Sequence, residues 1–173
     1  ASALIAVFTI LNLFGVRLVN LLNSVSVWWH LVGVAVIVGA LAIVPSHHQS
    51  AGFVFGHFYN GTGLTWGTLY IVLIGLLLAQ YTFTGYDASA HMTEETHDAA
   101  KAAPRGIVMS VVVSVIAGFV LLFAITWSIQ DYEAERTTAL GLPPAQIFID
   151  AVGHNTGTFL VFICMVAQWF CGM

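Results

Sequence analysis

Charged residues are scarce in this sequence: they make up 7% of its 173 residues, whereas hydrophobic residues make up 59%. A water-soluble domain carries about a quarter of its residues as charges, so the composition excludes an ordinary soluble protein. Lysine and arginine together number four, which is too few for a nucleic-acid-binding surface. The formal net charge of −4 says little about partners once the lipid bilayer is the solvent.

Cysteine is also rare, and the sequence predicts no metal ligand set and no catalytic residue. Cys164 and Cys171 lie in one apolar run, without the spacing of a metal site or a disulfide framework, and are interpreted as packing residues. His47, His48 and His57 lie in a segment rich in glycine and aromatic residues. For that segment a solvated loop is favoured over a metal site.

Long apolar runs predict an all-α polytopic membrane protein. A membrane-spanning helix needs about 20 apolar residues, and lipid does not tolerate open sheet edges. The sequence therefore predicts one transmembrane domain over residues 1–173, with five spans at 1–14 (partial), 25–44, 64–86, 106–129 and 157–173 (partial). If the third helix is broken, it extends inward to about residue 97. Because both terminal runs are apolar to their ends and no signal peptide precedes them, we expect a fragment of a longer chain.

The few basic residues suggest an orientation. Alternating spans place three of them in the loops of one face, namely Arg17, Lys101 and Arg105, and leave Arg136 alone on the other. The positive-inside rule then makes the first face cytoplasmic. On the outer face, Pro143-Pro144 followed by residues 145–152 predicts a short helix at the membrane surface.

The segment Tyr81-Thr82-Phe83-Thr84-Gly85-Tyr86-Asp87 interrupts an otherwise uniform apolar helix. One glycine and two β-branched threonines lower helix propensity together, and Thr84 with Asp87 has the spacing of a capping box. These features predict that the helix stops near Phe83 and restarts near Tyr86. The alternative is that the helix has simply reached the inner interface, since residues 64–86 already extend about 34 Å at helical rise.

A break within the membrane has a chemical use. Non-helical backbone at that depth is tolerated only where it is buried in protein or lines a cavity. The freed carbonyl groups of the first half-helix suit an ammonium group or a cation, and the start of the second presents amide donors and positive dipole. The segment therefore indicates a binding site for one end of a small charged solute.

The same residues resemble a known family. FTGYDASAHMTEET (residues 83–96), followed by APRGI (103–107), resembles the sixth helix and next inner loop of the amino acid–polyamine–organocation permease superfamily. The closest resemblance is to the amino acid/choline transporter branch. Residues 12–17 are similar to the family's segment between the fourth and fifth helices, and residues 146–173 resemble the eighth.

The resemblance implies a transporter rather than an enzyme. It implies part of an inverted-repeat, broken-helix transporter fold in the cell (plasma) membrane. It also implies secondary active transport of amino acids or related amines (GABA, choline or polyamine type) by alternating access. The expected driving force is a proton or sodium gradient. No cofactor is expected. The substrate's identity stays open, because the family's first broken helix lies upstream of these residues.

The resemblance also assigns roles around the break. Phe83, Thr84 and Gly85 correspond to the unwound segment that contacts substrate, and Tyr81 lies where the family often places an aromatic that closes over it. Asp87 stands where many relatives have glutamate, a departure that weakens a proton-relay role. With Gly85 near the midplane, the charged residues that follow would line a wet inner vestibule.

Four more residues are candidates for coupling or gating. Glu94, Glu95 and Arg105 match the inner loop, where opposite charges would pair as the cytoplasmic side closes; the alternative is that they are solvated. His30 lies where some proton-coupled relatives carry a lysine in place of a bound sodium ion. Histidine exchanges a proton near neutral pH, but a hydrogen-bonded structural histidine is the favoured alternative.

Two other functional classes compete with a carrier. A haem-containing electron-transfer subunit needs two deep histidines on facing helices, and in this sequence only His30 qualifies. An ion channel is disfavoured because the sequence contains no ring-forming filter motif.

Overall fold

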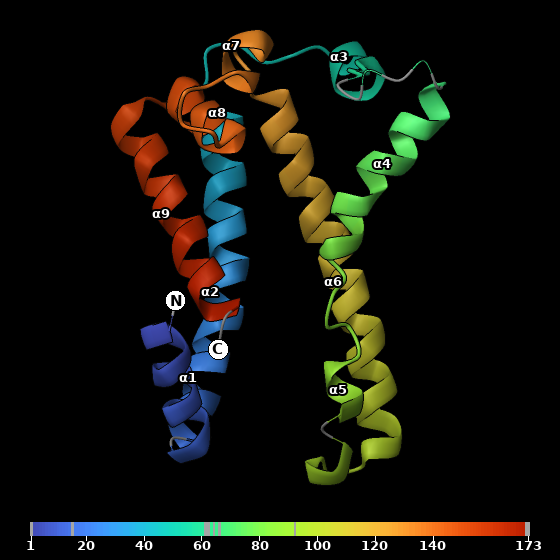
Figure 1. The fold of residues 1–173 in the computed structure, drawn as a ribbon, viewed down its shortest axis with the longest axis vertical. Coiled ribbons are helices and arrows are strands. Elements are labelled where there is room, and N and C mark those ends of the chain that lie inside the picture. Colours follow the sequence, from blue (N-terminus) through green and yellow to red (C-terminus); the bar gives the residue numbers. More distant parts are fainter. Residues whose placement is uncertain are drawn as a thin grey trace. The chain divides into compact units, whose positions relative to one another are not determined.

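The computed structural model describes residues 2–14, 16–60, 63, 65, 67–91 and 93–171, and within these ranges the chain is helical with no strand. It divides into two compact units, which are considered separately: Ala1–Ser50 with Phe123–Met173, and Ala51–Leu122. Both units contribute to one long helix, α6 (Ala99–Trp127), because the division falls between Leu122 and Phe123. The elements are drawn in Figure 1.

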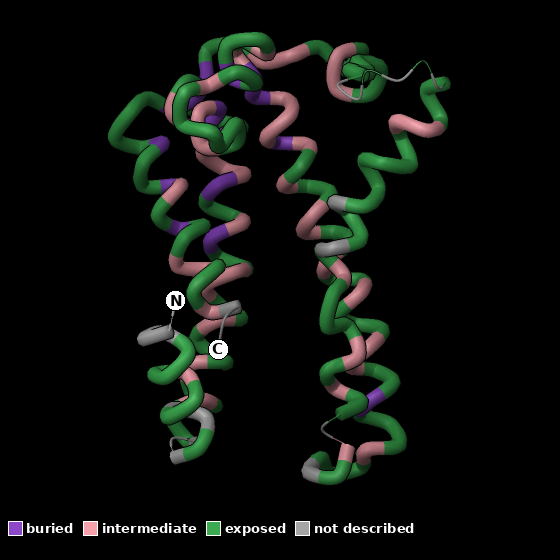
Figure 2. Tube along the Cα trace, in the orientation of Figure 1, coloured by how far each residue is buried: buried purple, intermediate pink, exposed green. Residues whose placement is uncertain are grey.

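The first unit packs two long helices side by side. Figure 1 shows α9 (His154–Cys171) running antiparallel to α2 (Val16–Ile43), with α1 (Ser2–Phe14) beside the beginning of α2. Most of the buried residues lie where α2 and α9 meet α8 (Pro143–Val152), as the burial colours of Figure 2 show. The core side chains there include Ile37, Leu41, Ile147, Phe148, Leu160 and Ile163.

The short helix predicted after the paired prolines is present as α8. Its first two positions are Pro143 and Pro144, where a missing N–H removes no helical hydrogen bond. Gly153 ends the helix with φ 84°, a left-handed conformation that suits glycine. The chain then turns directly into α9, and α8 packs closely against the first turns of α9.

A cluster of polar contacts holds the end of α2. The carbonyl oxygen of Leu41 accepts hydrogen bonds from Ser128 Oγ and from His48 Nε2, each at 3.0 Å. The His48 ring stacks on the Trp127 ring with centroids 4.0 Å apart. The backbone amide of Gln49 donates to the Trp127 carbonyl oxygen at 2.8 Å. These bonds satisfy a carbonyl group that the end of a helix leaves unpaired, and they tie the end of α2 to the end of α6.

Replacing Ser128 by alanine is expected to lower the melting temperature modestly. Ser128 is fully buried, so its loss deprives the Leu41 oxygen of one buried donor. The expected loss is about 1 kcal/mol, because His48 still donates to the same oxygen. The matched control is Ser24→Ala, whose exposed hydroxyl bonds only its own helix at Asn20 and whose loss should leave the melting curve unchanged. Equal melting temperatures of the two variants would contradict a stabilising role for the hydrogen bond from Ser128 to Leu41.

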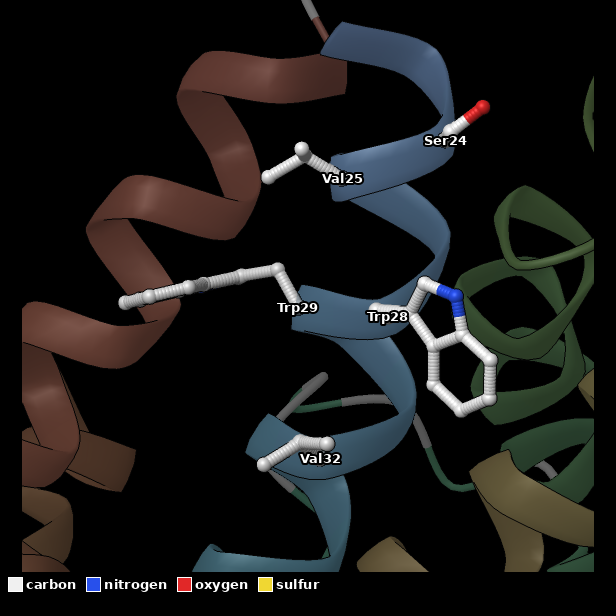
Figure 3. A pocket seen from close by; sticks show the side chains of 5 residues that line it. All are labelled: Ser24, Val25, Trp28, Trp29 and Val32. Atoms are coloured by element: carbon white, nitrogen blue, oxygen red, sulfur yellow. The ribbon is translucent and has the colours of Figure 1, made fainter. Parts of the chain in front are cut away.

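α2 carries two neighbouring tryptophans with different surroundings. Trp29 points toward α9 and donates from Nε1 to the Ile163 carbonyl oxygen at 3.1 Å, whereas Trp28 points away from α9 and is 69% exposed (Figure 3). They flank a hollow of about 360 Å³ whose lining residues, Ser24, Val25, Trp28, Trp29 and Val32, all belong to α2. A hollow with walls from a single helix is an open surface groove and has no facing wall to enclose a solute.

The second unit contains the predicted helix break. It comprises α3 (Ala51–Gly56), α4 (Thr68–Tyr81), α5 (Ala88–His91), the 3₁₀ turn η1 (Thr93–Glu95) and the part of α6 up to Leu122. Along α6 the chain returns beside the break: Ser110 Oγ lies 3.3 Å from the Tyr86 carbonyl oxygen, and Ser89 Oγ donates to Ala103 at 3.4 Å.

Two described helices, Arg17–Ile43 and Ala99–Trp127, are long and apolar enough to cross a membrane, and a shorter apolar helix covers Thr68–Leu77. The count of five spans stays a prediction. α2 begins at Val16 and α6 at Ala99, so both helices start before the predicted spans at 25–44 and 106–129 and include Arg17 and Lys101. The bounds of the spans stay a prediction, because a helix can continue past the apolar run that crosses the membrane.

Candidate functional site at the helix break

The interrupted helix is the central feature of the second unit. α4 ends at Tyr81, residues 82–87 form consecutive turns, and α5 begins at Ala88. The predicted interruption is therefore present, and it is about two residues wider on each side than the sequence suggested. The predicted capping box is wrong: α5 starts after Asp87, so Thr84 is not its N-cap. The 14 residues of α4 extend about 21 Å, less than the roughly 30 Å of hydrocarbon in a bilayer.

Gly85 makes the break possible. Its φ is +86°, a left-handed conformation that glycine adopts freely and other residues adopt at a cost of about 1–2 kcal/mol. A Cβ atom built on Gly85 would meet nothing within 4 Å, so the restriction at this position comes from backbone conformation and not from crowding. This conformation lies within the turn that separates the end of α4 at Tyr81 from the start of α5 at Ala88.

The turns leave several backbone groups available. Some are paired: the Phe83 oxygen accepts from the Tyr86 amide at 3.2 Å, and the Gly85 oxygen accepts from the Ala88 amide at 3.0 Å. Within the described part of the chain, the N–H groups of Thr84 and Gly85 and the carbonyl oxygens of Thr82 and Thr84 have no backbone partner. Amide donors suit a carboxylate, and carbonyl oxygens suit an ammonium group. One short turn therefore offers both kinds of group that a zwitterion requires.

A hollow of about 230 Å³ lies against these groups. Its walls are the turn and one side of α6: Thr82, Phe83, Thr84, Gly85, Tyr86, Ser110, Val111 and Ser114. A second hollow, about 380 Å³, shares Thr82, Phe83 and Ser114 with the first and is otherwise apolar. Its space exists because Gly75, Ala79 and Gly118 are small; a Cβ on Gly118 would lie 3.7 Å from Thr82 Cγ2. A polar hollow thus adjoins an apolar one at Phe83.

The structure brings together some of the predicted binding residues. Phe83, Thr84 and Gly85 all line the polar hollow, with Phe83 partly buried and the other two exposed. The Tyr81 side chain lies outside the described residues, so its predicted position over the substrate is not addressed. Ser110 and Ser114 were missed by sequence reasoning. Two serines four residues apart in an apolar helix were the available signal, because that spacing places them on one helix face.

The predicted gating residues of the second unit lie at the end of the turn and after it, and those whose side chains the structure describes are at least half exposed or classed as exposed. Asp87 pairs with His91 at 3.2 Å, with their side chains 50% and 77% exposed. Glu94 and Arg105 are exposed, and among the described residues no ion pair joins them. The Glu95 side chain lies outside the described residues. In this arrangement the charges are exposed, as the alternative of solvated loop residues expects. That Glu94 and Glu95 pair with Arg105 when the cytoplasmic side closes stays a prediction.

His30, the candidate for proton coupling, belongs to the first unit. Its Nδ1 atom lies 2.7 Å from the Ser26 carbonyl oxygen, one helical turn earlier in α2. A carbonyl oxygen only accepts, so Nδ1 carries the proton in this contact. The partly buried ring is therefore hydrogen-bonded within its own helix, as expected of a structural histidine.

Known proteins match this chain over its whole length. A family profile described as amino acid permease matches residues 1–173. The amino-acid permease BAT1 of Arabidopsis thaliana is 35% identical over 182 residues, covering 99% of this chain and 35% of the relative. The BAT1 homolog of Oryza sativa is 39% identical over 155 residues (84% and 30%), and the choline transporter of Saccharomyces cerevisiae is 28% identical over 135 residues (73% and 24%). No solved structure matches the chain significantly.

The chain spans about a third or less of the length of these curated relatives. Along that third the family match has no gap at either end, and it includes the broken helix on which the resemblance rested. The chain belongs to the amino acid permease family, within the amino acid–polyamine–organocation superfamily, whose members are membrane transporters and not enzymes.

Proposed function

We propose that the complete protein carries amino acids or related amines across the plasma membrane by alternating access, with the solute held at Phe83–Gly85. The observation that carries this proposal is the turn at residues 82–87, with its unpaired amide and carbonyl groups beside a polar hollow. A carrier needs a site that binds a small solute without covalent chemistry, and backbone groups at a broken helix provide one.

The substrate class follows from the size and polarity of the two hollows. The unpaired N–H and carbonyl groups would bind the charged end of the solute, while the adjoining apolar space would accept a hydrocarbon portion. The relatives support the same class, since they are named as an amino-acid permease, a choline transporter and a GABA-specific permease. In this proposal Tyr81 closes over the solute, and a proton or sodium gradient drives uptake.

The test is uptake by the complete permease, purified and reconstituted into proteoliposomes. The panel contains amino acids, GABA, choline and polyamines, each measured with and without an imposed proton or sodium gradient. Gradient-dependent accumulation of at least one of these solutes is expected. If none accumulates under any gradient, while a control transporter reconstituted in parallel remains active, the proposal fails.

A further inference from the structure

Glu135 is a buried acid in a part of the chain far in sequence from the helix break. It lies in α7 (Tyr132–Arg136) of the first unit and is 2% exposed. Glutamate is almost never fully buried unless it is paired, because removing a carboxylate from water is strongly unfavourable. The surroundings of this carboxyl group therefore determine which form of it the fold accepts.

The two oxygens of Glu135 have different environments. Oε1 accepts hydrogen bonds from the backbone amides of Gln130 at 3.0 Å and Asp131 at 3.4 Å. Oε2 is buried and has no hydrogen-bond partner. Oε1 accepts the two amide hydrogen bonds at the start of α7 in either charge state, because a protonated carboxyl group keeps one acceptor oxygen. The unpartnered oxygen is thus the place where a proton would reside.

The charges around Glu135 oppose its ionisation. Burial is the chief cause that raises the pKa of the Glu135 carboxyl above its ordinary range, and the nearby carboxylates of Asp150 and Asp131 raise it further. The two backbone hydrogen bonds lower the pKa and only partly offset this. Arg136, the sole lysine or arginine after Arg105, donates to Glu133 at 2.7 Å.

We propose that Glu135 is a proton-binding site: the folded α7–α8 segment takes up a proton on Oε2, which keeps α7 anchored through Oε1. The ligand is a proton and not a metal ion, because the described residues contain no group of three ligating side chains. Ionisation of Glu135 would place an unpaired charge in the interior and loosen this segment. The site is separate from the helix break and does not depend on the proposed transport function.

The sign of the pH effect follows from the raised pKa. A carboxyl group with a raised pKa in the folded state stabilises the fold fully below its unfolded pKa of about 4.3, and that contribution is lost as pH rises through the folded pKa. Other ionisable side chains lie around the segment, so the effect must be isolated by substitution. They are Asp131 and Glu133 at α7, Asp150 in α8, His47 and His48 in the neighbouring loop, and His154 at the start of α9.

The experiment compares melting of the complete permease, wild type against Glu135→Gln, across a pH series. Between about pH 5 and about pH 8, the melting temperature of the wild type is expected to fall by at least about 2 °C more than that of the variant. The matched control is Glu133→Gln, two residues away in the same helix, with a side chain 65% exposed and paired to Arg136. It should retain the wild-type slope.

A second measurement reads the proton directly. Infrared spectra of the wild type at about pH 5, just above the ordinary pKa of glutamate, should contain more protonated-carboxyl C=O absorption than those of Glu135→Gln, or of Glu135→Met if the glutamine variant does not fold. An unchanged pH slope in Glu135→Gln, or identical carboxyl bands in wild type and variant, would overturn the proposal.

Discussion

Replacing Gly85 by leucine is expected to abolish uptake by the complete permease while leaving its amount in the membrane unchanged. Leucine would have to adopt φ +86°, which costs about 1–2 kcal/mol, at a position that lines the hollow of about 230 Å³ beside the turn. Relaxation of this conformation would displace the amide and carbonyl groups that the proposed solute site requires. Initial uptake rates at equal protein levels measure the effect.

Alanine variants separate backbone conformation from crowding. A Cβ atom at Gly85 and one at Gly39 both meet nothing within 4 Å, but only Gly85 has a positive φ. Gly85→Ala should therefore lower uptake severalfold, whereas Gly39→Ala, near the end of α2, should leave it unchanged. Normal uptake in Gly85→Leu would remove the site assignment, and an equal loss in Gly39→Ala would show that the effect is not specific to the turn.

The helix break was predictable because its cause is local. Thr82, Thr84 and Gly85 lower helix propensity within four residues, and no distant contact is needed to interrupt the hydrogen-bond ladder there. The start of α8 at Pro143 was predictable for the same reason. The family resemblance added the expected depth of the break in the membrane and the roles of its residues, and substrate binding there stays a proposal.

Helix ends were less predictable, because hydropathy and helicity are different properties. The apolar run that predicted the second span begins at residue 25, yet α2 begins at Val16 and includes Arg17. Hydropathy marks where lipid contact should begin, whereas the helix continues until a residue stops it. α6 likewise begins at Ala99 and passes through Pro104, whose position near the start of the helix removes a single hydrogen bond.

Tertiary features were not predictable from the sequence at all. Glu135 lies in a polar stretch that no motif marks, and its burial depends on how α7 packs against α8. Ser110 and Ser114 line the polar hollow only because α6 returns beside the turn. In both cases the surroundings of the side chain depend on a neighbouring element, which no local sequence motif identifies.

The second large effect is expected at Gly157, where α9 crosses α8. A Cβ atom there would lie 2.6 Å from Ile149 Cα, 2.7 Å from Ile149 N and 2.8 Å from the Phe148 carbonyl carbon. Carbon atoms in contact prefer about 3.5–4.0 Å, and the atoms in the way are backbone, which no rotamer change can move. Gly157→Ala should therefore separate α8 from α9 and destabilise the fold by about 3 kcal/mol.

Gly33 provides the matched control for this crowding argument, because it also faces α9. A Cβ on Gly33 would lie 2.8 Å from Ile163 Cγ2, but that atom is the end of a side chain that can rotate away. Gly33→Ala should consequently cost about 1 kcal/mol or less, partly offset by the lower backbone entropy of an unfolded alanine chain. Size-exclusion chromatography of the detergent-solubilised permease after heating should show Gly157→Ala lost at temperatures that Gly33→Ala survives. If the two variants survive equally, the backbones of α8 and α9 do not approach as closely at Gly157 as the structure shows.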